Sequence, residues 1–381
     1  MKLKKILPQF LTLLFIVLIF GFFTMNAQEN MDTRGIEFGF GFLKQEASFD
    51  IQFSLIDYDG SKSYARAYLV GLLNTLLVSA IGIVLCTILG VVIGVARLSP
   101  NYLINRTASF YIEFFRNIPL LLQIFFWYFA ALRALPMPED ASLLLGTSYM
   151  TIKGLYTPAP IWNNFDVFLI SLIISLIIIF FFNRYAKRKQ EEAGIQYPKF
   201  LISLGIFIII PALTFIFGGV DLQWSFPELK QLAKTSFTYE GGVGIPPELI
   251  ALTLALTLYT ATFIAENVRA GIQGIGKGQK EAAASIGLTP GQVLKLVIMP
   301  QALRIIIPPT TNQYLNLTKN SSLAAAIAYP DLVLVFAGTA MMQTGRAIEI
   351  VAITMATYLT ISLLISFFMN WYNQTIAIKE K

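Results

Sequence analysis

Histidine is absent from this 381-residue sequence, cysteine occurs once, and charged residues make up only 13% of the chain. The absence of histidine excludes histidine metal ligands, Ser-His-Asp and Cys-His catalysis, and a histidine-based pH switch. A single cysteine, Cys86, excludes an internal disulfide and a multi-cysteine metal cluster. The charged fraction is about half that of an ordinary soluble domain, whereas 56% of the residues are hydrophobic and the mean hydropathy is +0.66. These shortages predict an integral membrane protein.

The apolar residues are concentrated in runs that approach or exceed the length needed to cross the hydrocarbon core of a bilayer. We therefore predict an all-α membrane protein with about eight transmembrane helices. The eight runs are Ile6–Met25, Leu69–Val95, Ile118–Leu132, Val167–Phe182, Phe200–Gly218, Leu249–Ala265, Ile305–Ala328 and Ile350–Met369. The first run also has the basic start of a signal peptide, but it is longer than a signal h-region and seven more runs follow. We interpret it as an uncleaved helix.

The distribution of basic residues predicts the orientation. With the N-terminus inside and alternating spans, the inner segments hold 17 of the 28 Lys and Arg residues and the outer segments hold 8. This excess fits the positive-inside rule, so the net charge of +6 indicates cytoplasmic loops rather than nucleic-acid binding. Both termini are then expected in the cytoplasm. The outer segment 26–68 has a stretch of alternating apolar residues, Phe49 to Leu55, that suggests a short strand or an extended cap.

The inner segment 266–301 differs from the spans in its polarity and its small residues. Its first part predicts a short helix from Gly278 to Gly287, with a low-profile surface of alanines and a left-handed glycine at its end. A second helix is expected after the capping box Thr289-Pro-Gly-Gln292, and Pro300 is expected to interrupt it before the next span. Two stiff helices joined by a tight turn suit docking to a partner protein. The same alanines would equally suit packing against neighbouring helix ends.

The spacing of six residues in this segment resembles the EAA loop of ABC-importer permeases. These candidate coupling residues are Gly278, Glu281, Ala282, Ala283, Gly287 and Pro300. The three residues before this proline, Val297-Ile298-Met299, differ from the family pattern Ile-x-Leu by two conservative replacements. Three further stretches narrow the resemblance to the polar amino-acid permeases, the histidine/glutamine/glutamate group. They are RNIPLLLQIFFWY (Arg116–Tyr128), GLLNTLLVS (Gly71–Ser79) and LTKNSSLAAAI (Leu317–Ile327).

The resemblance covers roughly residues 67–370 and implies a type-1 permease core of five helices. We assign 1–66 to an N-terminal helix with an outer segment, 67–370 to the permease domain with an inserted helical hairpin at 166–218, and 371–381 to a cytoplasmic tail. This longer layout and the stretch Gly39–Ile51 resemble the general L-amino-acid branch. The family implies two ABC ATPase subunits, a second permease subunit (identical or homologous), a periplasmic amino-acid-binding protein, and a bacterial inner-membrane location.

The chain lacks a P-loop for ATP. The nearest text, Gly274–Lys280, has neither the spacing nor the following Ser or Thr that cradles phosphates. The chain is thus expected to bind no cofactor and to be no enzyme, with ATP and Mg held by the partner ATPase. An ion-coupled secondary transporter is the rival class, but no acidic residue lies near the middle of a predicted span. An intramembrane enzyme has no nucleophile–base pair to support it. An importer of the same type for another small polar solute stays open.

The seventh run is unusually polar, and we expect it to border the substrate path. The candidate residues are Asn312, Asn316, Lys319, Asn320, Ser321 and Ser322. Polar side chains at membrane depth face a cavity or a neighbouring helix, and Lys319 is the one charge in its run. The alternative is hydrogen bonding between helices, with Lys319 extending its amine toward the interface or forming an ion pair.

Overall fold

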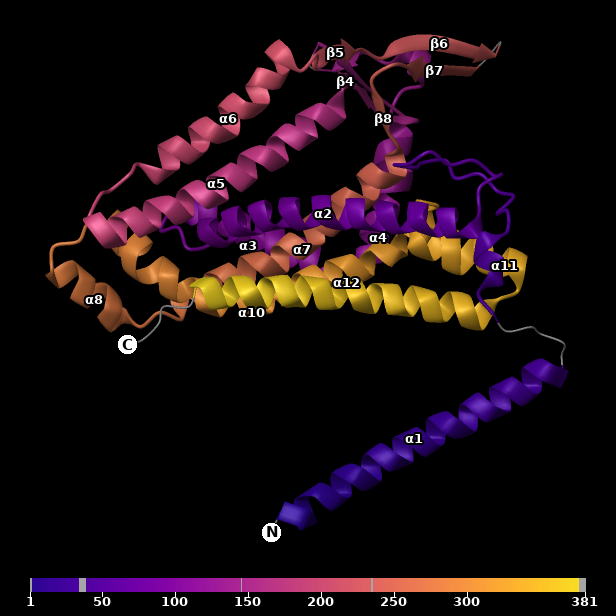
Figure 1. Ribbon diagram of the computed structural model, residues 1–381, viewed down its shortest axis with the longest axis horizontal. Coiled ribbons are helices and arrows are strands. Elements are labelled where there is room, and N and C mark those ends of the chain that lie inside the picture. The colour runs from indigo at the N-terminus through magenta and orange to yellow at the C-terminus, as the bar shows by residue number, and fades with distance from the viewer. Residues whose placement is uncertain (1, 34–38, 145, 234–235, 377–381) are drawn as a thin grey trace. The chain divides into compact units, whose positions relative to one another are not determined.

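The structure is a computed structural model that describes residues 2–33, 39–144, 146–233 and 236–376 (Figure 1). The predicted tail 371–381 therefore lies outside the described residues from position 377 onward. The chain divides into two compact units. We call Met1–Tyr128 with Ala251–Lys381 the core unit, and Phe129–Ile250 the insert unit. Each is described on its own.

Seven of the eight predicted spans correspond to helical segments of sufficient length or composition to cross a membrane. Six are single helical spans, and the seventh is a bent pair. The eighth, α1 (Lys2–Thr33), contains the apolar stretch Phe10–Asn26. The single spans comprise α2 (Tyr64–Ala96), α5 (Phe165–Ala193), α6 (Lys199–Phe217), α7 (Pro247–Gln273), α10 (Met299–Asn320) within the longer stretch Pro290–Ile327, and α12 (Ala347–Ile376).

The third predicted span is not a straight helix. The amphipathic helix α3 (Tyr102–Asn117) precedes it and is bent by 101° from the helical segment Leu120–Ala134, which begins with α4 (Leu120–Phe125). The bend falls at Ile118–Pro119, where proline disfavours a helical residue before it. The Gln123 amide donates to the carbonyls of Phe115 and Ile118 at 2.8 and 2.9 Å and so satisfies backbone groups that the bend frees. α3 contains no continuous apolar run, because polar residues alternate with apolar ones along its sequence, and it was therefore not predicted.

The predicted outer segment 329–348 contains helical structure rather than an irregular loop. A π-helix, η7 (Val333–Ala340), continues into α11 (Met341–Thr344). Phe336 of η7 is fully buried against Phe42 and Tyr68, with ring centroids 6.4 and 5.1 Å away. The same cluster includes residues of the segment 39–63, which has no regular strand. Phe49, Ile51 and Phe53 are partly buried there, so the expected alternation corresponds to an extended cap.

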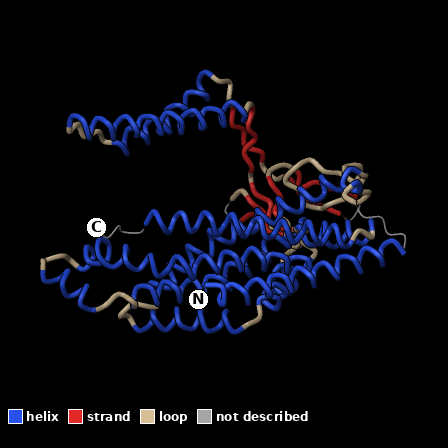
Figure 2. The backbone as a smooth tube through the Cα atoms, turned by 60° about the horizontal axis from the view of Figure 1, so that its bottom comes forward, coloured by secondary structure: helices blue, strands red, loops and turns tan. Residues whose placement is uncertain are grey.

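The insert unit contains β-structure, which corrects the all-α expectation for its outer segments. A four-stranded antiparallel sheet has the order β1 (Leu143–Leu144), β2 (Ser148–Thr151), β3 (Gly154–Thr157), β8 (Val243–Ile245). β4 (Ala159–Asn163) pairs with β5 (Asp221–Ser225), and β6 (Glu228–Ala233) pairs with β7 (Ser236–Glu240). The β4–β5 ribbon continues directly from the ends of α5 and α6 (Figure 2). Trp162 of the ribbon packs on Phe168 and Phe215 of these helices.

In the core unit, α2 approaches α7 closely through two glycines spaced four residues apart. A Cβ atom added at Gly90 would lie 2.6 Å from Cβ of Ile264, and one at Gly94 would lie 2.7 Å from the carbonyl oxygen of Ala265. Small residues at this spacing let two membrane helices approach each other and gain van der Waals contact. The glycines therefore determine the distance between α2 and α7.

We predict that Gly90→Leu destabilises the core unit by at least about 1–3 kcal/mol, because the added side chain must displace Ile264. The measurement is thermal unfolding of the detergent-purified protein. Gly205→Leu in α6 is the matched control, since a Cβ there meets no described atom within 4 Å. Equal melting temperatures for the two variants would show that the α2–α7 contact is not needed for stability.

Candidate substrate path and coupling loop

The coupling segment 266–301 contains the two predicted short helices. The first is α8 (Lys277–Ser285), and Gly287 follows it with a φ of +84°. The N–H of Leu288 donates to the carbonyl of Ala283, and that of Gly287 donates to Ala284. This is the Schellman arrangement, which needs a left-handed residue and so favours glycine. The predicted left-handed Gly287 is confirmed.

The second helix starts as predicted but does not end as predicted. The Thr289 hydroxyl accepts from the N–H of Gln292, the Gln292 side chain accepts from the N–H of Thr289, and α9 (Pro290–Gln292) follows. The π-helix η5 (Val293–Ile298) then leads directly into α10. The expected interruption at Pro300 is wrong. Pro300 lies where the π-helix η5 passes into α10, and the helical stretch continues from Pro290 to Ile327.

The two faces of this loop differ in exposure. Gly278, Glu281 and Ala282 are exposed, whereas Ala283 is 5% exposed and packs inward. The expected low-profile surface therefore excludes Ala283. Beside Gly287, the side chain of Ile286 is 78% exposed. The exposure of Ile286 was not predicted. An isoleucine directly before a helix-ending glycine in a polar loop could have indicated an exposed apolar contact residue.

The predicted path residues occupy different faces of α10 and of the 3-10 helix η6 (Ser321–Ile327). Asn312, Asn316 and Lys319 are all exposed, and their spacing of four and three residues places them on one stripe. We call these three residues the polar stripe. Hydrocarbon cannot satisfy two amides and an amine, so this face belongs against water or another protein rather than lipid.

The remaining three candidates are less accessible. Asn320 and Ser322 are half-buried, and the Ser322 hydroxyl donates to the carbonyl of Lys319 at 2.7 Å. Ser321 is fully buried, and its hydroxyl donates to the carbonyl of Thr318 at 2.7 Å. The two serines therefore bond within their own helical segment, and not between helices as the alternative predicted.

An ion cluster connects the C-terminal parts of α2 and α7. Glu266 accepts from Arg269 at 2.9 Å, which confirms the ion pair expected from their i, i+3 spacing. The other carboxylate oxygen of Glu266 accepts from Arg97 of α2. Arg97 could not be predicted as part of this cluster from sequence, because its partner lies 169 residues away.

At the opposite end of α2, a buried polar cluster holds the segment after η6. The Asn74 amide donates to the carbonyls of Phe53 and Pro330, each at 2.9 Å, and the Thr75 hydroxyl accepts from the N–H of Leu332 at 3.0 Å. Asp331 is fully buried between these groups and accepts from the N–H of Leu334 at 2.8 Å. Burial raises the pKa of the Asp331 carboxyl to about 7, against the opposing effect of backbone N–H groups.

This raised pKa predicts a pH-dependent stability. The unfolded carboxyl ionises near 3.8, whereas the folded one keeps its proton up to about 7. Between these values the folded state holds a proton that the unfolded state has lost, so the free energy of unfolding falls as pH rises and then levels off. We expect the melting temperature to fall from about pH 4 to about pH 7, and Asp331→Asn to reduce that fall. Asp57→Asn, at an exposed carboxylate, is the control and should leave the slope unchanged.

The long apolar helices, the exposed helical loop of the core unit and the polar stripe define a multi-pass membrane transport protein. Residues 199–378 match the family described as binding-protein-dependent transport system inner membrane component. The chain belongs to this family, whose members are the permease subunits of ABC transporters. The putative amino-acid ABC transporter permease YhdX of Escherichia coli (strain K12) is 48% identical over 374 residues, covering 98% of this chain and 94% of the relative.

Two further relatives match over most of their length. The general L-amino acid transport system permease AapQ of Rhizobium johnstonii is 44% identical over 381 residues, covering all of this chain and 94% of the relative. The glutamate/glutamine/aspartate/asparagine permease BztB of Rhodobacter capsulatus is 40% identical over 392 aligned positions, covering 93% of this chain and 89% of the relative. The expected family and the general L-amino-acid branch are therefore confirmed.

Proposed function

We propose that this chain imports L-amino acids as the permease subunit of a binding-protein-dependent ABC transporter. The observation that carries the mechanism is the coupling loop, whose Schellman turn presents Glu281, Ala282 and Ile286 on an exposed face. Partner ATPase subunits would dock there and would hold the ATP and Mg, while this chain binds no cofactor and performs no hydrolysis. The amino-acid substrate is supported by the names of the relatives that match the chain end to end.

The polar stripe provides the other half of the mechanism. A second permease subunit, identical or homologous, would face Asn312, Asn316 and Lys319, and the substrate would pass between the two subunits. A periplasmic amino-acid-binding protein would deliver the substrate to the outer side. Alternating access would then follow from a change in the angle between the permease subunits as the ATPases close and open.

Substrate competition tests this function. In vesicles that contain the complete transporter, acidic, basic and neutral L-amino acids should each reduce uptake of a labelled amino acid, and uptake should stop when ATP is removed. Inhibition only by another small polar solute would favour the alternative substrate. Uptake that persists without ATP but collapses with the ion gradients would favour a secondary transporter instead.

We further propose an inner-membrane location with both termini in the cytoplasm, which the distribution of basic residues supports. Impermeant thiol labelling tests the orientation in a Cys86→Ala background. A cysteine at Thr147, which is exposed, should react from outside in intact cells, and one at Lys189 should react only after the cells are opened. The adjacent Ser148 is a poor labelling position, because it is only 8% exposed and its hydroxyl donates to that of Thr157. Labelling of the Lys189 position from outside would reverse the topology.

A further inference from the structure

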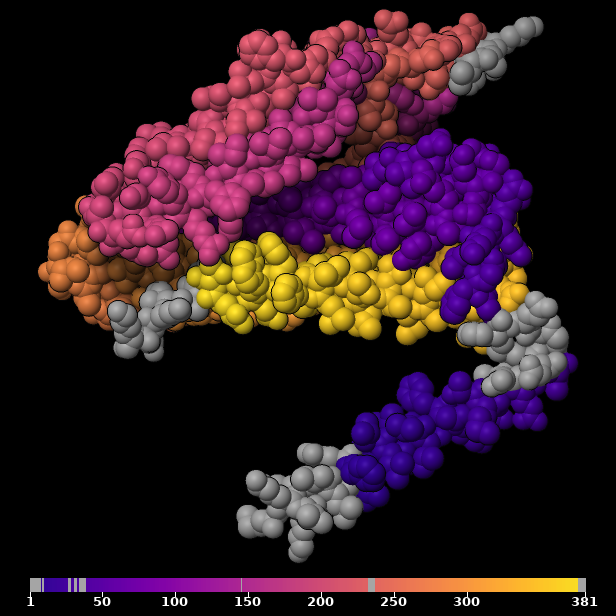
Figure 3. All heavy atoms as spheres, in the orientation of Figure 1, coloured from indigo at the N-terminus to yellow at the C-terminus, as the bar shows by residue number. Residues whose placement is uncertain are grey.

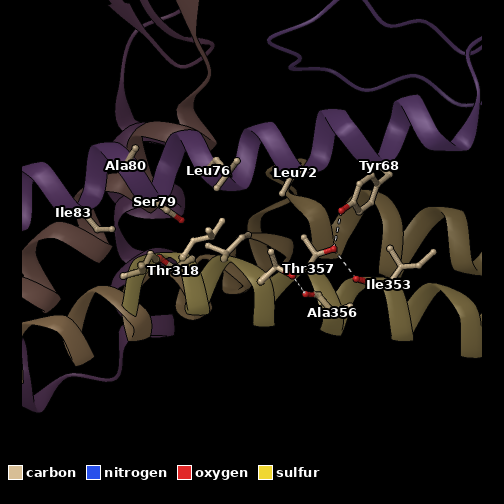
Figure 4. Close-up of a pocket in the computed structure, with 14 residues that line it drawn as sticks. Tyr68, Leu72, Leu76, Ser79, Ala80, Ile83, Thr318, Ile353, Ala356 and Thr357 are labelled. Atoms are coloured by element: carbon tan, nitrogen blue, oxygen red, sulfur yellow. Dashed lines mark hydrogen bonds between the residues drawn. The ribbon is translucent and has the colours of Figure 1, made fainter. Parts of the chain in front are cut away.

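A largely apolar groove of about 640 Å³ runs between α2 and α12 in the core unit. The two helices form neighbouring bands, violet and yellow, on the face shown in Figure 3. Leu72, Leu76 and Ile83 line one side, and Ile353 and Ile361 line the other. Thr318 of α10 forms part of the floor (Figure 4).

The groove contains small and hydroxylated residues as well as aliphatic ones. Tyr68 and Thr357 bond to each other across it at 2.8 Å. Ala80 and Ala356 add small side chains to its lining. Ser79 is 4% exposed, and its hydroxyl has no hydrogen-bond partner among the described residues. Membrane helices associate through such surfaces, because small residues allow close van der Waals contact and hydroxyls can bond across the interface.

The N-terminal helix α1 matches this groove in its character and in its attachment. Every described side chain of α1 is exposed, including large ones from Phe10 to Met25. The chain re-enters the core unit at Gly39, whose N–H donates to the carboxylate of Glu349 at 3.0 Å. Glu349 is 2% exposed and lies in the first turn of α12. Phe42, three residues after Gly39, is also buried.

This attachment limits where α1 can lie. Six residue steps separate Thr33 from Gly39, and an extended chain of that length reaches at most about 20 Å. The C-terminal end of α1 is therefore held near the Glu349 end of α12, and the first groove residue, Ile353, lies one turn further along α12. A short connection of this kind favours an antiparallel neighbour.

We propose that α1 packs in the groove between α2 and α12 of its own chain, antiparallel to both helices, and covers Ser79 and Thr318. The first membrane helix is then an integral part of the core that holds α2 and α12 beside α10, rather than a separate anchor. This inference does not depend on the nature of the transported solute.

Disulfide cross-linking of the full transporter in membranes tests the proposal. In a Cys86→Ala background with an N-terminal tag and a protease site between Thr33 and Gly39, single cysteines at positions 19, 20, 21 and 22 are each combined with Ala356→Cys. Four consecutive positions sample a full helical turn. At least one pair should cross-link under oxidation. The two fragments, with the tag, should then stay joined after cleavage at the 42.4 kDa of the whole chain plus the tag, and no dimer band should be seen before cleavage.

Met355→Cys is the matched control, because Met355 adjoins Ala356 but is 68% exposed and lies outside the groove. Pairs with this position should not cross-link. A covalent dimer before cleavage would show that α1 of another copy occupies the groove. Loss of the tag from all four pairs in a transport-active protein would show that lipid or another subunit fills it. Either result would overturn the proposal.

Discussion

Gly287→Trp is expected to give membrane-inserted protein that holds its ATPase subunits weakly and no longer imports substrate. The φ of +84° at Gly287 imposes a backbone cost of about 1 kcal/mol or more on any other residue. A Cβ at Gly287 meets no described atom within 4 Å, so the indole would project outward beside Ile286 rather than disturb the spans. Copurification of the ATPase and binding-protein-stimulated ATP hydrolysis measure the effect.

Two variants separate the causes of that loss. Gly287→Ala adds the backbone strain without the bulk, so it should retain most of the ATPase binding. Gly205→Trp places the same indole on α6, where a Cβ also meets no described atom, and should leave coupling nearly intact. Normal transport by the Gly287→Trp protein would show that this turn does not dock to the ATPase.

Lys319→Ala is expected to reduce amino-acid uptake by about tenfold or more, the effect of losing one hydrogen bond to a charged group. Lys319 lies on the same exposed stripe as Asn312 and Asn316, so in the proposed transporter its amine would face a substrate carboxylate that passes between the permease subunits. Alanine is a good helix former, and α10 should remain intact. Uptake at a low substrate concentration is the measurement, with ATPase copurification as the test of assembly.

Lys319→Arg is the matched control, because it keeps the positive charge on a long side chain and should retain part of the uptake. Lys187→Ala, on the exposed end of α5, tests whether loss of any surface lysine matters. Unchanged uptake of acidic, basic and neutral amino acids by Lys319→Ala would indicate that the amine extends to the membrane interface and has no transport role.

Much of the core unit could be predicted from the sequence because its signals are local. Apolar runs locate α2, α7, α10 and α12, with ends that differ from the observed ones by one to eight residues. The end of α8 and the capping box at Thr289 depend on residues within one or two turns, so the sequence alone predicts their geometry correctly. The same locality explains why the pairing of Glu266 with Arg269 could be predicted.

The features that were missed depend on residues far apart in the chain. In the insert unit, Leu155 of β3 pairs with Ile245 of β8, and no pattern within either short strand specifies that partner. The sequence likewise could not show that Arg97 reaches Glu266. Pro300 was misjudged for another reason. A proline removes one N–H from the regular bonding of an α-helix interior, but Pro300 lies where the π-helix η5, whose bonding pattern already differs, passes into α10.

That π-helix also constrains how the chain can change by insertion or deletion. A π turn holds an extra residue compared with an α turn, and each residue of an α-helix advances the rotation by about 100°. Deleting one residue between Val293 and Ile298 would allow an ordinary α turn to form there, and the helix would remain continuous. Because each kind of turn completes one rotation, the face of α8 would keep its orientation relative to Asn312 and Asn316. A second deletion would find no extra residue to remove and would rotate that face by about 100°, so the π turn gives this segment tolerance for the loss of one residue and no more.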